Sequence, residues 1–557
     1  MAHARLTSAG CLPIAMSGLL ANLTRHTSNA ITPNLRRFVA TRQIELWMVA
    51  VAIGIGVAGA AIAFRAVIGM VQYAWLGTSS ETMIERVGSL PFWAVIIAPA
   101  AGGLVVGLLL QFALPNRRAE VVADVIEAKA IKGGRMGLGT GLLSAAVAAI
   151  SLGSGASAGR EGPVVHLGAT LGSWIAGRLH LPAGSTRTLL GCGVAAAIAA
   201  SFNAPIAGVL FALEVILGHY ALSAFVPIVI CAVAATVITR IQFGNFPAFA
   251  VPDYTIMSFY EFPAFALLGI VCAAVAISFQ FALIMTDRIA RGITMPVWAR
   301  PVIGGLMVGA IGVFLPEILG VGYAATDAAL RQQYSLAMLL VLIVAKTAAT
   351  AITLASRFGG GVFSPSLYLG AMAGGAFGII AAMAFPEQAS SHGLYALIGM
   401  GGVAAAVLGA PISTILIVFE LTGGFEVAIA LMLTISISSG LTQAVYGRSY
   451  FHLQLESRGL VLTEGAHRTI MFTLAVRDFM TPLGPDEPAP RLAEDARRLT
   501  PDDTLETALR LFDHAGEGRL AVVAARDSDT VVGWVSHVAA LDRFNKGLID
   551  ANVEEHR

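Results

Sequence analysis

The sequence predicts an all-α, polytopic membrane protein with an inverted internal repeat of broken, re-entrant helices, followed by a small α/β cytoplasmic segment. Hydrophobic residues make up 56% of the chain and charged residues only 12%, against roughly a quarter charged in soluble domains. Apolar stretches follow one another from Ile44 to Val445, and glycine-proline breaks recur in step in two halves of that region. These observations place most of the chain in a lipid bilayer.

Residues 1–43 are predicted to form a cytoplasmic N-terminal segment. They carry arginines shortly before the first long apolar run and no acidic residue. By the positive-inside rule such a segment stays in the cytoplasm. The apolar run from Leu12 to Leu23 is too short to span a bilayer, and we find no convincing signal-peptide cleavage site after it.

Residues 44–459 are predicted to form the transmembrane domain of a multi-pass protein of the plasma (inner) membrane. The apolar stretches long enough to cross a bilayer are 45–76, 93–114, 221–242, 260–285, 335–355 and 425–445. Shorter apolar stretches surround the glycine-proline motifs. Irregular backbone at membrane depth occurs only where it is buried in protein or lines a cavity, so these short stretches predict re-entrant helices.

The motif Gly159-Arg160-Glu161-Gly162-Pro163 sets a carboxylate between two apolar segments. A carboxylate at membrane depth is costly unless it is paired or faces water, so we interpret Glu161 as functional. Pro163 suits the first turn of a helix, which places Glu161 at a helix N-terminus, where free N–H groups and the helix dipole favour an anion. Either the carboxylate or a dissolved anion then occupies the site. The alternative is that Glu161 only caps the helix and pairs with Arg160.

Two pairs of segments indicate the internal repeat. The stretch from Gly359 to Ala371 copies the pattern of Gly159 to Ala169. Asn203-Ala204-Pro205-Ile206 followed by Glu214 is matched, at the same offset, by Gly409-Ala410-Pro411-Ile412 followed by Glu420. Repeats with interrupted helices in corresponding places point to a transport site near the membrane midplane.

Three segments of the chain resemble the signature segments of the CLC family of chloride channels and proton-coupled chloride antiporters: Gly159-Arg160-Glu161-Gly162-Pro163, Phe202-Asn203-Ala204-Pro205 and Gly361-Val362-Phe363-Ser364-Pro365. The resemblance runs from about residue 45 to residue 460. It implies that Glu161 is the gating glutamate and that backbone N–H groups of Val362 and Phe363 help to hold the central anion. The candidate anion-binding residues it suggests are Gly159, Arg160, Gly162, Gly361, Val362 and Phe363. It also implies a homodimer with one pathway per subunit, paired through apolar faces around 206–230 and 411–440.

Two departures from the family pattern concern the anion site. The segment that aligns with the family's central serine is Ala119-Glu120-Val121-Val122-Ala123-Asp124-Val125, so Glu120 stands where a neutral hydroxyl usually binds the anion. A carboxylate there repels chloride unless it is protonated or turned away; the alternative is a solvated glutamate at a cytoplasmic vestibule. Phe451 falls on the position of the family's central tyrosine, with Tyr450 as a substitute only after a register shift. Glu120 and Phe451 complete the candidate anion-binding residues.

A third departure concerns coupling. Family antiporters usually carry an inner glutamate that relays protons, and the matching position here is Val215, as in the family's channels. His166 also resembles the channel branch, although a lone histidine is more often a packing residue. We therefore expect a voltage- or pH-gated chloride channel that opens when Glu161 is protonated and displaced. The alternative is a proton-coupled antiporter of chloride, fluoride or nitrate.

Residues 460–557 are predicted to form a cytoplasmic tail, because the composition becomes that of a soluble protein. The tail resembles one CBS motif, carried by Val476–Pro482, Thr500–Leu509, Arg519–Val523 and Val532–Val535. Asp502 or Asp503 is expected to cap an amphipathic helix that strands follow. A single CBS-like motif implies pairing across a dimer. The one cofactor considered is an adenine nucleotide at this tail; the alternative is a degenerate tail that helps assembly.

Other classes of function find little support in the sequence. A net charge of +1 offers no broad basic face for nucleic acid. The four cysteines are scattered, without metal-ligand or disulfide spacing, and neither an HExxH motif nor a Ser/His/Asp set accompanies Glu161. The prediction is a transporter and not an enzyme, with a small monovalent anion, protons and lipid as partners. A membrane-embedded enzyme or sensor is the remote alternative.

Overall fold

The computed structural model describes residues 43–79, 86–245, 249, 254–422, 425–460, 462, 470–471, 474–484, 498–515, 518–525 and 530–556. The predicted N-terminal segment lies outside the described residues except for Gln43, and so does the proline-rich part of the tail over residues 485–497. The division of the chain at 43–44 and 459–460 therefore stays a prediction.

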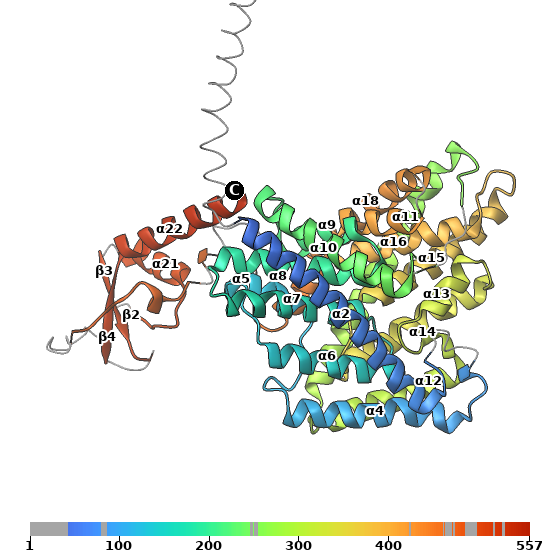
Figure 1. Cartoon of the computed structure of the whole chain (residues 1–557), viewed down its shortest axis with the longest axis horizontal. Coiled ribbons are helices and arrows are strands. Elements are labelled where there is room, and N and C mark those ends of the chain that lie inside the picture. Colours follow the sequence, from blue (N-terminus) through green and yellow to red (C-terminus); the bar gives the residue numbers. More distant parts are fainter. Residues whose placement is uncertain are drawn as a thin grey trace, which may run out of the picture.

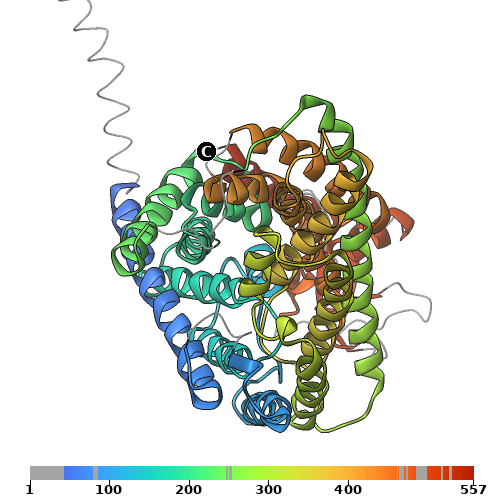
Figure 2. The ribbon, with the colours of Figure 1, turned by 90° about the vertical axis from the view of Figure 1, so that its right-hand side faces the viewer.

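The membrane part is helical throughout (Figure 1). Its first half contains α2 (Gln43–Leu76), α4 (Phe92–Phe112), α5 (Val122–Ile131), α6 (Leu138–Gly153), α7 (Glu161–Arg178), α8 (Ala183–Phe202), α9 (Pro205–Phe211), the π-helix η1 (Ala212–Leu217) and α10 (Leu222–Phe243). Its second half contains η2 (Phe259–Glu261), α11 (Phe262–Gly292), α12 (Ala299–Phe314), η3 (Pro316–Ile318), α13 (Tyr323–Leu330), α14 (Leu336–Ala355), α15 (Phe363–Ala384), α16 (His392–Leu408), α17 (Pro411–Thr422), α18 (Phe425–Tyr446) and α19 (Tyr450–Glu456). In Figure 2 the blue-to-teal helices of the first half lie on one side and the yellow helices of the second half on the other.

Eight helices among the described residues are long and apolar enough to cross a membrane. Six of them coincide with the stretches predicted to span. Ala183–Phe202 and Phe363–Ala384 were missed because glycine and alanine dominate them and they flank the motifs. Shorter apolar helices, α6, α12, α16 and α17 among them, confirm the predicted mixture of spanning and broken helices.

The repeat is visible in how the central helices pack. An added Cβ at Gly168 of α7 would lie 2.3 Å from the Gly193 carbonyl of α8, and one at Gly370 of α15 would lie 2.3 Å from the Gly399 carbonyl of α16. Only glycine permits such an approach of two helix backbones, and small residues serve this purpose in membrane helix pairs. The same close pair therefore occurs once in each half.

Both halves also break their helices in the same way. Asn203 ends α8 with a φ of 58° and Gly409 ends α16 with a φ of 66°, the left-handed conformation common after a helix. Each is followed by an alanine and by the proline that starts the next helix. The predicted inverted repeat of broken helices is thus confirmed.

A pair of carboxylates joins the two halves at these breaks. Glu214 in the first half accepts hydrogen bonds from the Ile412 and Ser413 N–H groups at the start of α17, at 3.0 and 2.8 Å. Glu420 in the second half accepts the equivalent bonds from Ile206 and Ala207 at the start of α9, at 3.1 and 2.8 Å. Each carboxylate satisfies exposed N–H groups and the dipole of the other half's helix, so the two short helices are fixed reciprocally.

The tail contains a small α/β unit, as predicted. Its described part consists of η4 (Val476–Asp478), β1 (Thr481–Pro482), β2 (Arg498–Leu499), α21 (Leu505–Ala515), β3 (Arg519–Val523), β4 (Val531–Ser536) and α22 (His537–His556). The strands form one sheet in the order β1-β4-β3-β2. The expected cap of α21 was wrong: Thr504 accepts the Thr507 N–H at 3.2 Å, whereas Asp503 turns back to the Thr500 N–H at 2.7 Å.

Candidate functional site

The two glycine motifs meet at the centre of the molecule. Gly159 and Gly361 exchange backbone hydrogen bonds of 2.7 and 2.8 Å and form an isolated antiparallel bridge. An added Cβ at Gly162 would lie 3.2 Å from the Gly361 Cα, so the first turns of α7 and α15 come together. Two helix N-termini, with free N–H groups and positive dipole ends, therefore converge on one place. This is the arrangement that binds an anion.

A cavity of about 330 Å³ lies against these helix starts. Five of the predicted anion-site residues line it, namely Gly162, Gly361, Val362, Phe363 and Phe451. Tyr450 lines it too, so the aromatic pair contributes both rings to the wall. Gly159 and Arg160 do not line this cavity: Gly159 makes the bridge, and Arg160 lines a smaller pocket beside α2 and α8.

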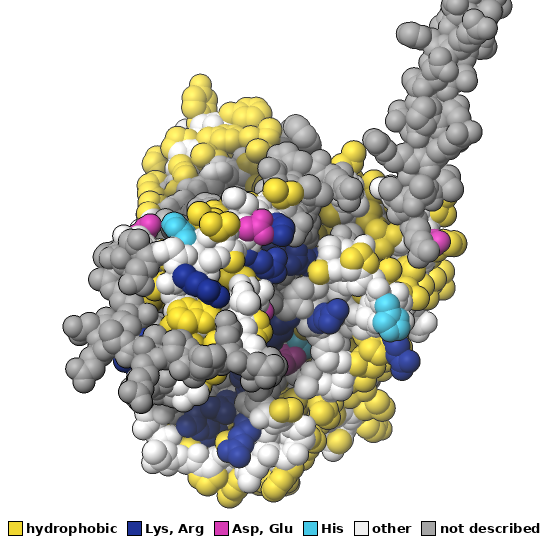
Figure 3. All heavy atoms as spheres, turned by 90° about the vertical axis from the view of Figure 1, so that its left-hand side faces the viewer, with side chains coloured by type: hydrophobic (Ala, Val, Ile, Leu, Met, Phe, Trp, Pro, Cys, Tyr) yellow, Lys and Arg dark blue, Asp and Glu magenta, His cyan; other side chains and the backbone are white. Residues whose placement is uncertain are grey.

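Arginines surround the mouth of the cavity, and no motif in the sequence points to them. They are Arg118, Arg291, Arg300, Arg357 and Arg458. Asp287 is the one acidic residue among the described residues of the wall. Figure 3 shows the corresponding face, on the side of the tail, with lysine and arginine side chains gathered around a hollow. A cleft lined by one sign of charge concentrates the opposite ion, so this mouth attracts anions.

Asp124 organises two of these arginines. Arg118 approaches its carboxylate with both terminal nitrogens, one of them at 2.9 Å, and Arg458 lies 2.9 Å from Asp124 Oδ1. Burial raises the pKa of Asp124, but the hydrogen bond from Arg118 and the charges of Arg458 and Arg118 outweigh it and lower the pKa below its usual value. The carboxylate stays ionised and holds the two guanidinium groups at the mouth.

Glu161 begins α7, as predicted, and is completely buried. Its carboxylate accepts a hydrogen bond of 2.5 Å from the Tyr323 hydroxyl, and a further one from the Ser364 hydroxyl at the start of α15. Arg160 Nε lies 3.8 Å from Oε1, which is long for an ion pair. The alternative in which Glu161 only pairs with Arg160 is therefore less well supported than a carboxylate held by two hydroxyls from the other half of the chain.

Tyr323 is held from several sides. The Arg160 guanidinium lies 4.7 Å from the centre of its ring, and the ring of Phe249 lies 4.8 Å away. Lys346, fully buried in α14, donates hydrogen bonds of 3.0 Å to the carbonyls of Ile318 and Gly320 in the loop that leads to Tyr323. These contacts fix the hydroxyl that faces Glu161. The sequence offered no signal for Tyr323. Ser364 could have been predicted as a site residue, because it stands inside the repeated motif.

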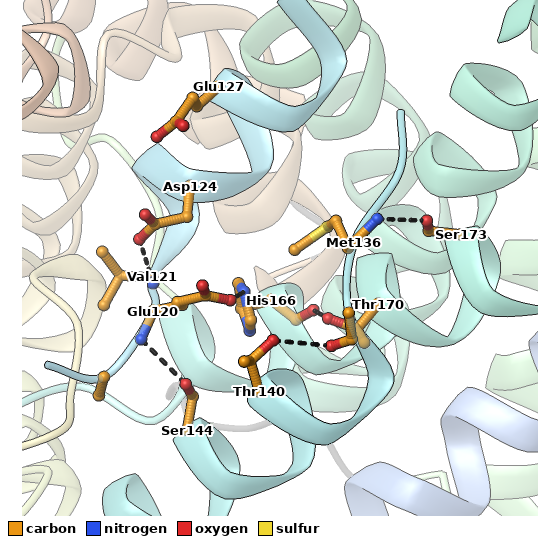
Figure 4. Close-up of polar contacts among 12 residues, drawn as sticks. Glu120, Val121, Asp124, Glu127, Met136, Thr140, Ser144, His166, Thr170 and Ser173 are labelled. Carbon is orange, nitrogen blue, oxygen red and sulfur yellow. Dashed lines mark hydrogen bonds and ion pairs between the residues drawn. The ribbon is translucent and has the colours of Figure 1, made fainter. Parts of the chain in front are cut away.

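Glu120 is not among the residues that line the cavity, although Ala119 and Val121 on either side of it are. Its Oε2 is 3.2 Å from His166 Nε2 on α7, and its backbone N–H donates to Ser144 Oγ at 3.0 Å (Figure 4). The neighbouring imidazole of His166 lowers the pKa of the Glu120 carboxyl. The place of Glu120 among the anion ligands stays a prediction; in this structure its side chain faces a histidine.

A family description of voltage-gated chloride channels matches residues 102–443 of the chain. The chain belongs to this family. It is accordingly a multi-pass membrane protein of the CLC family, and the family's function class is anion transport. The sequence resemblance to the CLC family is confirmed.

Several individual CLC proteins are similar to this chain. A putative ClcB-like chloride channel protein from Ralstonia nicotianae is 36% identical over 69% of this chain and 91% of its own length. The H(+)/Cl(−) exchange transporter ClcA from Vibrio cholerae is 32% identical over 56% of this chain and 68% of its own length. The crystal structure of a slow cyanobacterial Cl−/H+ antiporter superposes with a TM-score of 0.66 at 21% identity, covering 74% of this chain and 97% of that one. That last likeness supports the CLC fold.

Val215, the position that the CLC resemblance matches with the inner glutamate of antiporters, lies half-buried in η1. Its neighbour Glu214 is engaged at the start of α17 through Ile412 and Ser413. In this CLC protein the adjacent Glu214 carboxylate therefore serves to hold the start of α17.

Replacing Tyr323 by phenylalanine is expected to raise the affinity for chloride. The substitution removes a hydrogen bond to a charged group, worth about 1.5 to 3 kcal/mol, and so weakens the hold on the Glu161 carboxylate that competes with the anion. By the usual conversion this corresponds to about tenfold or more in affinity, measured by calorimetry in detergent. Tyr220→Phe, at an exposed tyrosine, is the control. Unchanged or weaker chloride binding in Tyr323→Phe would contradict a competing carboxylate.

Proposed function

We propose that this protein exchanges chloride, or a similar small anion, for protons across the membrane, with Glu161 as the group that both gates the anion and carries the proton. The observation that carries the proposal is the buried carboxylate of Glu161 at the meeting point of two helix N-termini, close to a cavity whose wall carries five arginines. The similarity to a relative named as an H(+)/Cl(−) exchange transporter supports it.

The steps follow from the charges at the site. Anions gather at the arginine-lined mouth and enter the cavity, where the backbone N–H groups of Val362 and Phe363 bind them. The Glu161 carboxylate competes for the same positive helix ends. Protonation removes the charge of Glu161 and weakens its hold on the helix ends. An anion then takes the place of the side chain, and the side chain displaces the anion again once it has lost its proton. Exchange in opposite directions follows if the protonated side chain reaches one side of the membrane and the anion the other.

A passive channel is the second candidate. The valine at position 215 favours it, as does the relative from Ralstonia nicotianae that is named a chloride channel protein. The sequence alone favours the channel. We now rank it second, because Glu161 is enclosed by the protein and because a named exchanger matches more than half of the chain.

The two candidates differ in whether chloride movement can drive protons uphill. Purified protein in liposomes, with a chloride gradient directed outward and the membrane potential clamped by potassium and valinomycin, is expected to take up protons against their gradient at a fixed ratio to chloride. External pH and chloride efflux are recorded together. Chloride efflux without proton movement would reject exchange and favour the channel, and the absence of chloride efflux would reject both.

We also propose a homodimer in the plasma (inner) membrane with both termini in the cytoplasm. Ile206 on α9 and Ile412 on α17 are 53% and 46% exposed, and Leu222 at the start of α10 is 70% exposed. These side chains lie on the faces that the CLC resemblance assigns to subunit pairing. Crosslinking of cysteines introduced at position 412 in native membranes tests the dimer.

A further inference from the structure

Glu120 and His166 bring two titratable side chains together beside the first half of α7. His166 lies five residues after Glu161 on α7, about 1.4 turns and about 7.5 Å of helix rise. The exposed fraction of the side chain falls from 19% at Glu120 to 1% at His166, and Glu161 is fully buried. The three residues therefore mark a sequence of decreasing access to solvent that ends at the gating carboxylate.

The surroundings of the pair are polar although the helices around it are apolar. Figure 4 shows Thr140 and Ser144 of α6 and Thr170 of α7 around His166. Thr170 Oγ1 donates to the His166 carbonyl at 2.8 Å, and Ser144 Oγ accepts the Glu120 N–H. Such hydroxyls are the partners that water molecules need in a protein interior.

Few other charges act on the pair. Asp124 and Arg118 are the charged neighbours of Glu120, and they oppose each other. The described residues of α6 and α15, which pack against α7, include no charged side chain. On the remaining neighbours, Arg187 of α8 lies near Gly134, and α2 carries Arg65, which stacks on Phe243, and Glu45. Besides Asp124, α5 carries Glu127, which pairs with Lys132, and Lys129.

A structural role alone does not account for the pair. Burying a histidine against a carboxylate carries a desolvation penalty that a well-packed apolar pair of similar volume avoids. Histidine takes up and releases protons near neutral pH and has two ring nitrogens, so it can accept a proton on one side and release it on the other. A group with these properties at this depth suits proton transfer.

We propose that Glu120 and His166 form the cytoplasmic proton-transfer pair that supplies Glu161. This inference rests on the proposed exchange function. A proton from the cytoplasmic solvent binds the Glu120 carboxylate, passes to His166 Nε2, and leaves the ring by way of water for the Glu161 carboxylate; the reverse path returns it. Only the proton moves along this path. The path bypasses position 215, so exchange does not require a titratable side chain there.

The test measures proton uptake and chloride efflux together in proteoliposomes of the full-length protein. Glu120→Gln and His166→Gln keep a polar side chain of similar size but do not relay protons at neutral pH. We expect the proton rate in each to fall by about tenfold or more, while chloride efflux continues at a similar rate. Glu120→Asp, which restores a carboxylate, is expected to recover part of the proton rate. Glu127→Gln, on α5 and paired with Lys132, is the matched control and should keep the parental ratio.

The ratio of protons to chloride distinguishes the outcomes. A parent protein that pumps protons and variants that keep its ratio would overturn this inference and leave the exchange function standing. A proportional fall of both fluxes, or the same fall in Glu127→Gln, would also overturn it, because it would indicate a structural or general charge effect. A parent that moves chloride but no protons would overturn both proposals. Each variant is first checked for monodisperse behaviour in detergent and for chloride binding.

Discussion

Glu161→Gln is expected to abolish chloride-driven proton uptake while chloride efflux continues. Glutamine keeps the shape of the side chain but can neither take up a proton nor carry a negative charge to the helix ends. Both the competition with the anion and the proton carrier are therefore removed in one change. Chloride efflux should equal or exceed that of the parent and become nearly independent of pH, whereas in the parent it should rise as the pH falls, since protonation releases the carboxylate.

The measurement uses the same proteoliposomes at several external pH values. Glu127→Gln, a carboxylate outside the cavity wall, serves as the control for loss of one negative charge. Sustained proton pumping by Glu161→Gln would show that Glu161 is not the proton carrier. Chloride efflux that keeps the pH dependence of the parent would show that it is not the gate.

Val362→Pro is expected to weaken anion binding by about ten- to a hundredfold, because a hydrogen bond to a charged group contributes about 1.5 to 3 kcal/mol. Val362 stands directly before α15 and lines the cavity, and first-turn N–H groups have no partner within their own helix. Proline removes that N–H. The bridge to Gly159 uses the N–H and carbonyl of Gly361, which the substitution leaves in place.

Val362→Ala is the matched control for this position, because it shortens the side chain and keeps the N–H. Its chloride affinity should stay within a few fold of the parent in calorimetric titrations. Equal affinity in the proline variant and the parent, on protein that remains folded and monodisperse, would show that the backbone at this position does not bind the anion. A large loss in the alanine variant would assign the effect to the side chain instead.

Much of the fold could be predicted because glycine and proline residues mark the positions at which the helices are interrupted. Pro163 and Pro205, with their counterparts Pro365 and Pro411, mark the helix starts in both halves, and the structure places helices there. Glu161 could be recognised because a lone carboxylate in an apolar region is rare and costly. These are local signals, and each can be read within about ten residues of sequence.

The partners of Glu161 could not be predicted in the same way. Tyr323 is 162 residues from Glu161 in the chain and stands in no motif. The arginines of the cavity mouth come from separate loops and helix ends, so only the folded backbone brings them together. Glu120 was aligned with an anion ligand, but an alignment fixes the position of a residue and not the direction of its side chain. The contact with His166 decides that direction.

The reciprocal carboxylates at the two helix breaks have a consequence for how the chain matures. Glu420 is made 214 residues after Ile206, whose N–H it accepts. Until the ribosome has delivered the second half, the start of α9 inside the membrane lacks its protein partner, and unsatisfied N–H groups are costly there. The first half therefore emerges from the translocon incomplete and stays adaptable until Glu420 arrives. Insertion of the last helices, rather than of the first ones, closes the structure.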